Sequence, residues 1–252
     1  MIILTTAVGY GPGELSIFWD SLMGTGYKGK VVVIGDAPCL ESRGAKIIPL
    51  DIPSLKHINF LRWEAYAEYL KSVDEPVVIT DVRDVVFQKN PEEFMPTEGV
   101  NVFEEDAIKT IGECWFNNHW MEKIGVNKFK DKNIICAGVT SGRLSEYAQA
   151  MWDSILEFNI DMNILENCGG DQAVHNNLIY SGFPAKIHKN EKAEVYTVGH
   201  TPSVETDKND FIINKEGYIP CMVHLYDRHV NLIVSAIKRL KLRVELNREV
   251  TV

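Results

Sequence analysis

The feature that most constrains this chain is segment 76–91, PVVITDVRDVVFQKNP, in which a short apolar run ends on a carboxylate. A second carboxylate follows three residues later, so the segment carries Asp81 and Asp84 with an arginine between them. Residues 77–79 have no polar side chain, and such a run predicts a buried strand. Open α/β sheets bind ligands at the carboxyl ends of their strands. The segment therefore predicts a ligand site at the end of a strand.

The two acids allow two interpretations. Carboxylates held this close repel each other unless a cation lies between them. An oxygen-only ligand set favours Mg²⁺ or Mn²⁺ over Zn²⁺, and these ions bind through one or two carboxylates together with substrate phosphates. The alternative is a surface turn in which Arg83 neutralises both acids. This motif alone leaves both interpretations open.

Length and charge narrow the class of protein. The chain has 252 residues, which is enough for one α/β domain with a large core. Its 45% hydrophobic and 24% charged content is usual for a soluble protein. The formal net charge of -9 argues against a broad nucleic-acid surface, because phosphate backbones are bound by clustered Lys and Arg. A local cationic pocket for one diphosphate is compatible with this charge.

The cysteines indicate neither a disulfide framework nor a zinc site. They are odd in number, scattered, and without a Cys-x-x-Cys pair: Cys39, Cys114, Cys136, Cys168 and Cys221. A strand-like segment begins at Ile2, which leaves no room for a signal peptide, and no stretch approaches the roughly 18 apolar residues of a membrane span. We therefore expect reduced thiols in a soluble, cytoplasmic protein.

Strands and helices are expected to alternate, which predicts a single domain with a mainly parallel α/β sheet flanked by helices. The expected strands are Ile2–Ala7, Val31–Gly35, Ala45–Leu50, the run after Pro76, and Asn133–Thr140. The expected helices are Glu14–Met23, His57–Val73, Leu144–Phe158, Asp171–Tyr180 and Val230–Leu242. Residues 101–132 have a less regular pattern, and residues 186–224 read as short strands and turns. No repeat or linker divides the chain.

The first loop, TTAVGYGPG at 5–13, is a candidate nucleotide site. Its glycines allow close approach of the backbone to a ligand, and Tyr10 offers a ring face to a base. The glycine spacing is not that of the dinucleotide fingerprint, and no phosphate-binding lysine follows. Gly and Pro are also ordinary turn residues, so the loop has a purely structural alternative.

The order of these motifs resembles the GT-A class of nucleotide-sugar glycosyltransferases, above all the retaining family-8 galactosyl- and glucosyltransferases. That class carries an Asp-x-Asp metal motif at the end of such a strand, where this chain has Asp-x-x-Asp. The resemblance implies a Rossmann-like GT-A fold, bound Mn²⁺ or Mg²⁺, and a UDP-sugar or GDP-sugar donor. Asp84 matches the metal-binding second acid, whereas Asp81 either ligates the metal or holds the donor sugar or Arg83. The first loop, with Thr6, Ala7 and Tyr10, would hold the nucleoside.

Two further segments carry the resemblance. Arg62, on the helix before the acidic motif, matches an arginine that contacts the donor sugar and an acid of the metal motif, and Asp81 is its expected partner. Without the resemblance, Arg62 reads equally as a surface residue. The strand IICAGV at 134–139 matches one whose small residues, here Ala137 and Gly138, leave space for the sugar, and Cys136 replaces its asparagine.

The remaining matches lie in the second half of the chain. In GGDQAVHN at 169–176, the resemblance places Asp171 on donor or acceptor hydroxyls and Gln172 beside the anomeric carbon. Taken alone, Asp171 reads as a helix N-cap. In MVHLYDRH at 222–229, the resemblance makes His224 the third protein ligand of the metal. Arg228 is a candidate for the diphosphate by its charge and fork geometry.

These observations predict a glycosyltransferase that moves a hexose from a nucleoside diphosphate sugar to a hydroxyl of a glycan, glycoprotein or lipid-linked acceptor. A nucleotidyltransferase and a non-catalytic sugar-binding module are the alternatives. The acidic run 104–106 reads either as the source of a general base for an inverting reaction or as a solvated loop, and retention or inversion stays open. The basic C-terminal run reads either as an amphipathic helix packed on the sheet or as a peripheral contact with an anionic membrane: Lys238, Arg239, Lys241 and Arg243.

Overall fold

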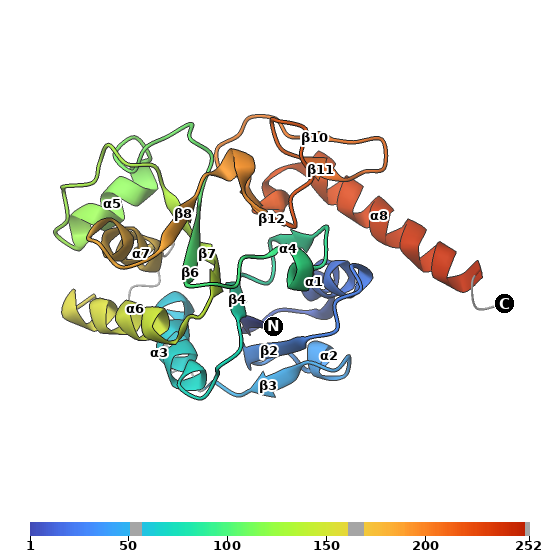
Figure 1. Ribbon diagram of the computed structural model, residues 1–252, viewed down its shortest axis with the longest axis horizontal. Helices are drawn as coiled ribbons and strands as arrows, with labels where there is room; N and C mark the ends of the chain where they lie inside the picture. Colours follow the sequence, from blue (N-terminus) through green and yellow to red (C-terminus); the bar gives the residue numbers. More distant parts are fainter. Residues whose placement is uncertain (51–56, 161–168, 250–252) are drawn as a thin grey trace.

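A seven-stranded sheet forms the centre of the computed structural model, which describes residues 1–50, 57–160 and 169–249 (Figure 1). In order across the sheet, the strands are β3 (Lys46–Ile48), β2 (Lys30–Gly35), β1 (Ile2–Ala7), β4 (Val77–Thr80), β7 (Ile135–Gly142), β6 (Val100–Glu104) and β8 (Lys186–His188). Strand β7 is antiparallel to both of its neighbours, and the other neighbouring pairs are parallel. The predicted mainly parallel α/β sheet is confirmed.

Helices cover both faces of this sheet, which explains why its central strands are almost entirely apolar. One face packs against α3 (Ile58–Leu70), α5 (Trp115–Lys123), α6 (Ser145–Glu157) and α7 (Gly170–Tyr180). The other packs against α1 (Pro12–Gly24) and α2 (Pro38–Glu41). Alternation along β1 shows the two faces, since Ile2 and Leu4 join the first cluster while Ile3 and Ala7 join the second.

A second, three-stranded sheet brings the C-terminal part of the chain to the acidic motif. It contains β5 (Val85–Phe87), β12 (Met222–His224) and β9 (Val195–Thr197) in that order, with β12 antiparallel to β5. The shorter elements are α4 (Pro91–Phe94), η1 (Asn190–Lys192), β10 (Glu205–Thr206), β11 (Ile212–Ile213) and η2 (Tyr226–Arg228). The register places His224 opposite Val85, the residue after Asp84.

The C-terminal helix α8 (Val230–Glu249) packs against α1 and extends away from the sheets (Figure 1). Its Arg239 is buried and donates hydrogen bonds to the Phe87 carbonyl at 2.8 Å and to Gln88 Oε1 at 2.7 Å. Arg239 therefore has a structural role and cannot take the membrane-facing position that the sequence allowed. The side chain of Arg243 lies outside the described residues. None of the described helices is long and apolar enough to cross a membrane.

The expectation of an irregular segment at 101–132 is wrong in two places. Strand β6 begins at Val100, and α5 covers Trp115–Lys123. Both elements have weak local signals: the pairing of β6 with β7 shifts register after Val102, and α5 is rich in Asn and aromatic residues, which are mediocre helix formers. Tertiary packing of Trp120 and Met121 into the core stabilises this helix. Among the cysteines, Cys39, Cys114, Cys136 and Cys221 are free thiols, while Cys168 lies outside the described residues.

Candidate active site

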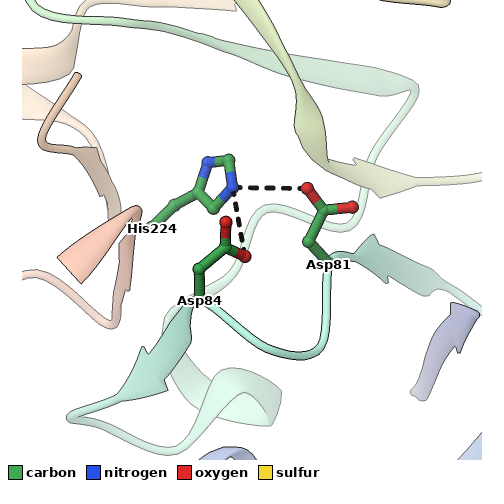
Figure 2. A group of neighbouring side chains, drawn as sticks. All are labelled: Asp81, Asp84 and His224. Atoms are coloured by element: carbon green, nitrogen blue, oxygen red, sulfur yellow. Dashed lines mark ion pairs between the residues drawn. The ribbon is translucent and has the colours of Figure 1, made fainter. Parts of the chain in front are cut away.

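Asp81, Asp84 and His224 converge where the two sheets meet, and Figure 2 shows the imidazole facing both carboxylates. The distance from His224 Nε2 is 3.4 Å to Asp81 Oδ2 and 3.7 Å to Asp84 Oδ1. One ligand atom from each residue lies within 4.8 Å of the others. These three residues were the predicted metal ligands, and the fold brings all three together.

The backbone around the cluster holds each ligand in place. The Asp81 N–H donates to the Gly138 carbonyl at 2.8 Å, which extends the β4–β7 pairing by one residue. The Leu225 N–H donates to the Asp84 carbonyl at 2.8 Å, which ties the end of β12 to the acidic turn. Leu225 has a φ of 62°, a conformation that costs free energy for a branched residue and is kept where surrounding structure requires it. The sharp turn after His224 is one such place.

The pKa values of the two acids are shifted in opposite directions. For Asp81, burial raises the pKa, but Arg62 and His224 together hold it well below the ordinary value. For Asp84, burial raises the pKa, and the Asp81 charge adds to this against the opposing effect of His224. Burial lowers the pKa of His224, but Cys136, Asp84 and Asp81 raise it well above its usual range. The three side chains therefore perturb one another's pKa values, as expected for ionisable groups buried next to each other.

Three observations fit a divalent cation at this point. His224 Nε2 is buried and has no hydrogen-bond partner among the described residues, although it faces two carboxylates. Gly138 leaves room beside the cluster, because a Cβ there would lie 2.3 Å from His224 Cε1 and 2.7 Å from Asp81 Oδ2. Two carboxylates and one imidazole are a donor set suited to Mn²⁺ and compatible with Mg²⁺.

Arg62 joins the Asp81–Asp84–His224 cluster to a second acid. Its Nη1 lies 2.6 Å from Asp81 Oδ1 and its Nη2 lies 2.6 Å from Asp171 Oδ2. The expected Arg62–Asp81 pair is therefore present, and Asp171 is a second partner that the sequence did not indicate. Asp171 is the second residue of α7, after the N-cap Gly169, so the N-cap alternative is wrong. Burial raises the pKa of Asp171 against the lowering effect of Arg62.

A cavity of about 220 Å³ opens on the first-loop side of the cluster. Its walls include Thr6, Tyr10, Asn59, Arg83 and Asp84. Thr6 Oγ1 donates to the Tyr66 hydroxyl at 2.7 Å, which fixes the end of β1 against α3. Thr6 and Tyr10, which were predicted to hold the nucleoside, thus line a cavity beside the Asp81–Asp84–His224 cluster.

A second cavity of about 390 Å³ lies on the other side of the cluster, and both cavities share Asn59, Arg62 and Asp81. The second cavity is lined by the residues predicted to surround the sugar, Ala137, Gly138, Asp171 and Gln172, and by Arg228, the candidate for the diphosphate. The Gln172 amide is oriented by its neighbours, since Nε2 donates to Asn117 Oδ1 at 2.9 Å and to Glu105 Oε1 at 3.2 Å. Its Oε1 accepts from the Ala137 N–H at 3.4 Å.

Three predicted side chains have positions that the sequence did not indicate. The Ala7 side chain is fully buried in the core, and Val8 lines the first cavity in its place. Arg83 pairs with Asp227 at 3.2 Å, which argues against the surface-turn alternative in which Arg83 neutralises Asp81 and Asp84. Arg228 lies at the edge of the second cavity, where its Nη1 donates to the Gly199 carbonyl at 3.1 Å.

The structure also decides the alternative left open for the acidic run and shows a contact of Cys136 that the sequence did not indicate. The acidic run at 104–106 is not a solvated loop: Glu105 lines the second cavity, and Asp106 is buried, accepting hydrogen bonds from Thr201. Burial raises the pKa of Glu105 against the effects of Arg228 and His224. Cys136 Sγ lies 3.2 Å from His224 Nδ1, whereas Nε2 of the same ring faces Asp81 and Asp84. The position of Glu105 next to a strand end was the one available signal for it.

Comparison with known proteins bears on the fold. No protein-family model matches the chain, and no curated protein sequence matches it. Among solved structures, the chain is similar to the crystal structure of the galactosyltransferase LgtC in complex with donor and acceptor sugar analogues. The TM-score is 0.61 at 15% identity, over 97% of this chain and 96% of that chain. This chain has the GT-A fold. At this level of sequence identity, the similarity shows that the two backbones are arranged alike, and it does not show that the two proteins catalyse the same reaction.

Proposed function

We propose that this protein is a metal-dependent glycosyltransferase that transfers a hexose from a nucleoside diphosphate sugar, a UDP-sugar or GDP-sugar, to a hydroxyl of an acceptor. The observation that carries the proposal is the position of the Asp81–Asp84–His224 cluster between two adjoining cavities at the carboxyl end of β4. This edge of an α/β sheet is where ligands bind. The two cavities match the two halves of a nucleotide sugar joined by a diphosphate.

Asp81, Asp84 and His224 would hold Mn²⁺ or Mg²⁺. When bound, the cation supplies positive charge for the diphosphate, which carries most of the charge that develops as the glycosidic bond breaks. Arg83 and Arg228 add positive charge on the two sides of the cluster. Arg83 is paired with Asp227, and Arg228 donates a hydrogen bond to the Gly199 carbonyl. To bind the diphosphate, each arginine must either keep this contact and add the diphosphate as a second partner, or give the contact up.

The first cavity suits the nucleoside. Tyr10 can stack on the base, and the polar groups of Thr6 and Asn59 can position the base and the ribose. The second cavity suits the sugar, where Asp171 and Arg62 present charged groups to its hydroxyls and Gln172 presents an amide held in one orientation. Oriented polar groups of this kind position the reacting carbon and exclude competing geometries.

The role of Glu105 depends on the stereochemical course of the reaction. In a retaining reaction the leaving diphosphate can take the acceptor proton, so no protein base is needed. In an inverting reaction a carboxylate must reach the acceptor hydroxyl, and Glu105 lines the sugar-side cavity with a raised pKa that suits a base. Glu105→Gln would therefore abolish transfer by an inverting enzyme, whereas a retaining enzyme would keep measurable turnover.

The two alternatives differ from this proposal in testable ways. A nucleotidyltransferase needs basic residues in the early loop, and segment 8–13 contains none. Its reaction would release diphosphate from a nucleoside triphosphate and a sugar phosphate. A non-catalytic binding module would bind the nucleotide sugar without cleaving it.

Thermal-shift screening against nucleoside diphosphates and nucleotide sugars, with Mn²⁺ and with EDTA, tests the proposal. A ligand raises the melting temperature according to its concentration relative to its dissociation constant. We expect stabilisation by one nucleotide class in Mn²⁺, its loss in EDTA and in Asp84→Ala, and slow hydrolysis of the donor in water. Equal stabilisation in EDTA would refute the metal assignment, and the absence of any donor cleavage would favour the binding module.

A further inference from the structure

Cys136 and His224 contact each other where the two sheets meet. Cys136 lies on β7 of the large sheet and His224 on β12 of the small one, and Cys136 Sγ lies 3.2 Å from His224 Nδ1. Each residue is 2% exposed, so both groups are removed from bulk water. Figure 2 shows that this second ring nitrogen is directed away from Asp81 and Asp84. The thiol and the two carboxylates therefore lie on different sides of one imidazole ring.

An irregularity of β7 accompanies this contact. The pairing of β7 with β6 is regular up to Thr140 and resumes at Cys136, so residues 137–139 have no partner on β6. Bulges of this kind are common beside active sites, where they redirect a side chain. Gly138, two residues after Cys136, faces the same ring, since a Cβ there would lie 2.3 Å from His224 Cε1. The contact between the thiol and the ring is thus built into the geometry of the strand.

The proposed cation requires one particular tautomer of His224. Nε2 lies 3.4 Å from Asp81 Oδ2 and 3.7 Å from Asp84 Oδ1, so this nitrogen must present its lone pair to the cation. The proton of a neutral imidazole then lies on Nδ1, and this buried N–H needs an acceptor. Within the described residues, Cys136 Sγ is the one hydrogen-bond partner of Nδ1. The thiol therefore lies where metal-binding histidines usually have the partner that orients the ring.

We infer that Cys136 is a positioning residue for His224: its sulfur accepts a hydrogen bond from Nδ1–H, which orients the ring and leaves the Nε2 lone pair for the cation. The inference rests on the proposed metal-dependent function and gives a role to a residue that the proposal does not use. Loss of such a partner costs roughly 10- to 100-fold in metal affinity or activity. Since sulfur is a weak acceptor, we expect the lower end of this range.

Calorimetric titration with Mn²⁺ measures the effect, in the presence of UDP or GDP, whichever raises the melting temperature of wild-type protein. Cys136→Ala removes the acceptor and should weaken Mn²⁺ binding by about tenfold. Cys136→Ser keeps an acceptor and should recover most of this affinity. Cys221→Ala is the matched control, because Cys221 is also a buried free thiol but donates its hydrogen bond to the Lys89 carbonyl at 3.3 Å. The control should bind Mn²⁺ as wild-type protein does.

Nitrogen NMR reads the tautomer directly in protein labelled with ¹⁵N-histidine. Saturating Mg²⁺ replaces paramagnetic Mn²⁺, the nucleotide is the same, and His224→Ala identifies the signals of His224 among the seven histidines. We expect a protonated Nδ1 and an unprotonated Nε2 in wild-type protein and in Cys136→Ser. In Cys136→Ala the Nδ1 signal should move, because its proton has lost the acceptor.

The outcomes separate this inference from the proposed function. Failure of wild-type protein to bind Mn²⁺ with either nucleotide would count against the proposed function itself. If wild-type protein binds the cation, an unprotonated Nδ1 would overturn the inference without any variant. Equal Mn²⁺ affinity in Cys136→Ala and wild type, or no recovery in Cys136→Ser, would also overturn it. Melting temperatures check the fold of each variant, and the wild-type spectrum decides if a variant is unfolded.

Discussion

Arg62 donates a hydrogen bond of 2.6 Å to Asp81, so the helix before β4 is tied directly to the acid that ends this strand. The same guanidinium group donates to Asp171 at 2.6 Å. One buried guanidinium group thus connects the Asp81–Asp84–His224 cluster to the second cavity. Both hydrogen bonds join oppositely charged groups that are largely removed from water, so the orientation of the Arg62 guanidinium group is well defined.

We predict that Arg62→Ala lowers turnover far more than it lowers nucleotide affinity. The change leaves Asp81 and Asp171 without their shared cation, which should cost about 3 kcal/mol of folding stability, and it disorders the sugar side of the site. Steady-state kinetics with the nucleotide sugar, calorimetry with the nucleoside diphosphate, and urea unfolding measure the three quantities. An equal loss of affinity for the nucleoside diphosphate and the nucleotide sugar would place Arg62 on the nucleotide side.

His224 should be a metal ligand whose loss leaves the fold intact. His224→Ala removes the Nε2 that faces both carboxylates and should weaken Mn²⁺ binding by roughly 100-fold. His224→Asp should recover part of the affinity and activity, because a carboxylate is also a ligand for hard cations. Calorimetric titration with Mn²⁺ in the presence of nucleoside diphosphate tests this. Unchanged affinity in His224→Ala would make the residue structural and direct attention to Asp227 and His229.

Gly138 lies on β7, next to the proposed metal site, and we expect Gly138→Ala to displace two of the metal ligands. The added Cβ would lie 2.6 Å from His224 Nε2 and 2.7 Å from Asp81 Oδ2, closer than real Cβ atoms approach, so both ligands must move. We expect loss of Mn²⁺-dependent donor binding with the fold retained, because the atoms displaced belong to side chains. Gly13→Ala is the matched control, since its Cβ would meet no heavy atom within 4 Å. Equal donor binding in the two variants would contradict the arrangement of the cluster.

Buried His175 should make the protein less stable in acid. It accepts or donates a 2.6 Å hydrogen bond with the Tyr147 hydroxyl, and burial together with Arg62 lowers its pKa from 6.5 to about 3. Below pH 6.5 the unfolded state binds a proton that the folded state excludes, so stability is present above the unfolded pKa and falls as the pH is lowered toward 3. Between pH 7 and pH 5 this residue should account for about 2 kcal/mol of lost stability.

Urea unfolding at pH 7 and at pH 5 measures this effect in wild-type protein and in His175→Asn. The variant should be less stable at pH 7 but should lose about 2 kcal/mol less than wild type between the two values. The same loss in both proteins would show that His175 is protonated in the folded state.

Local sequence predicted those features that depend on neighbouring residues. The apolar run before Asp81 predicted a strand with acids at its carboxyl end, and the spacing of apolar residues in 57–73 predicted the helix that carries Arg62. The alternation of strands and helices predicted the mainly parallel sheet. In each case the relevant contacts lie within a few residues along the chain, so periodicity and turn chemistry are sufficient.

Tertiary structure decided which distant groups meet. Resemblance to a family named His224, but only the register of β12 on β5 places its imidazole between Asp81 and Asp84. The second partner of Arg62 depends on how α7 packs beside α3, and the burial of Glu105 depends on the wall that α5 and α7 build around it. Register and burial are set by the packing of the whole core, which no short stretch of sequence contains.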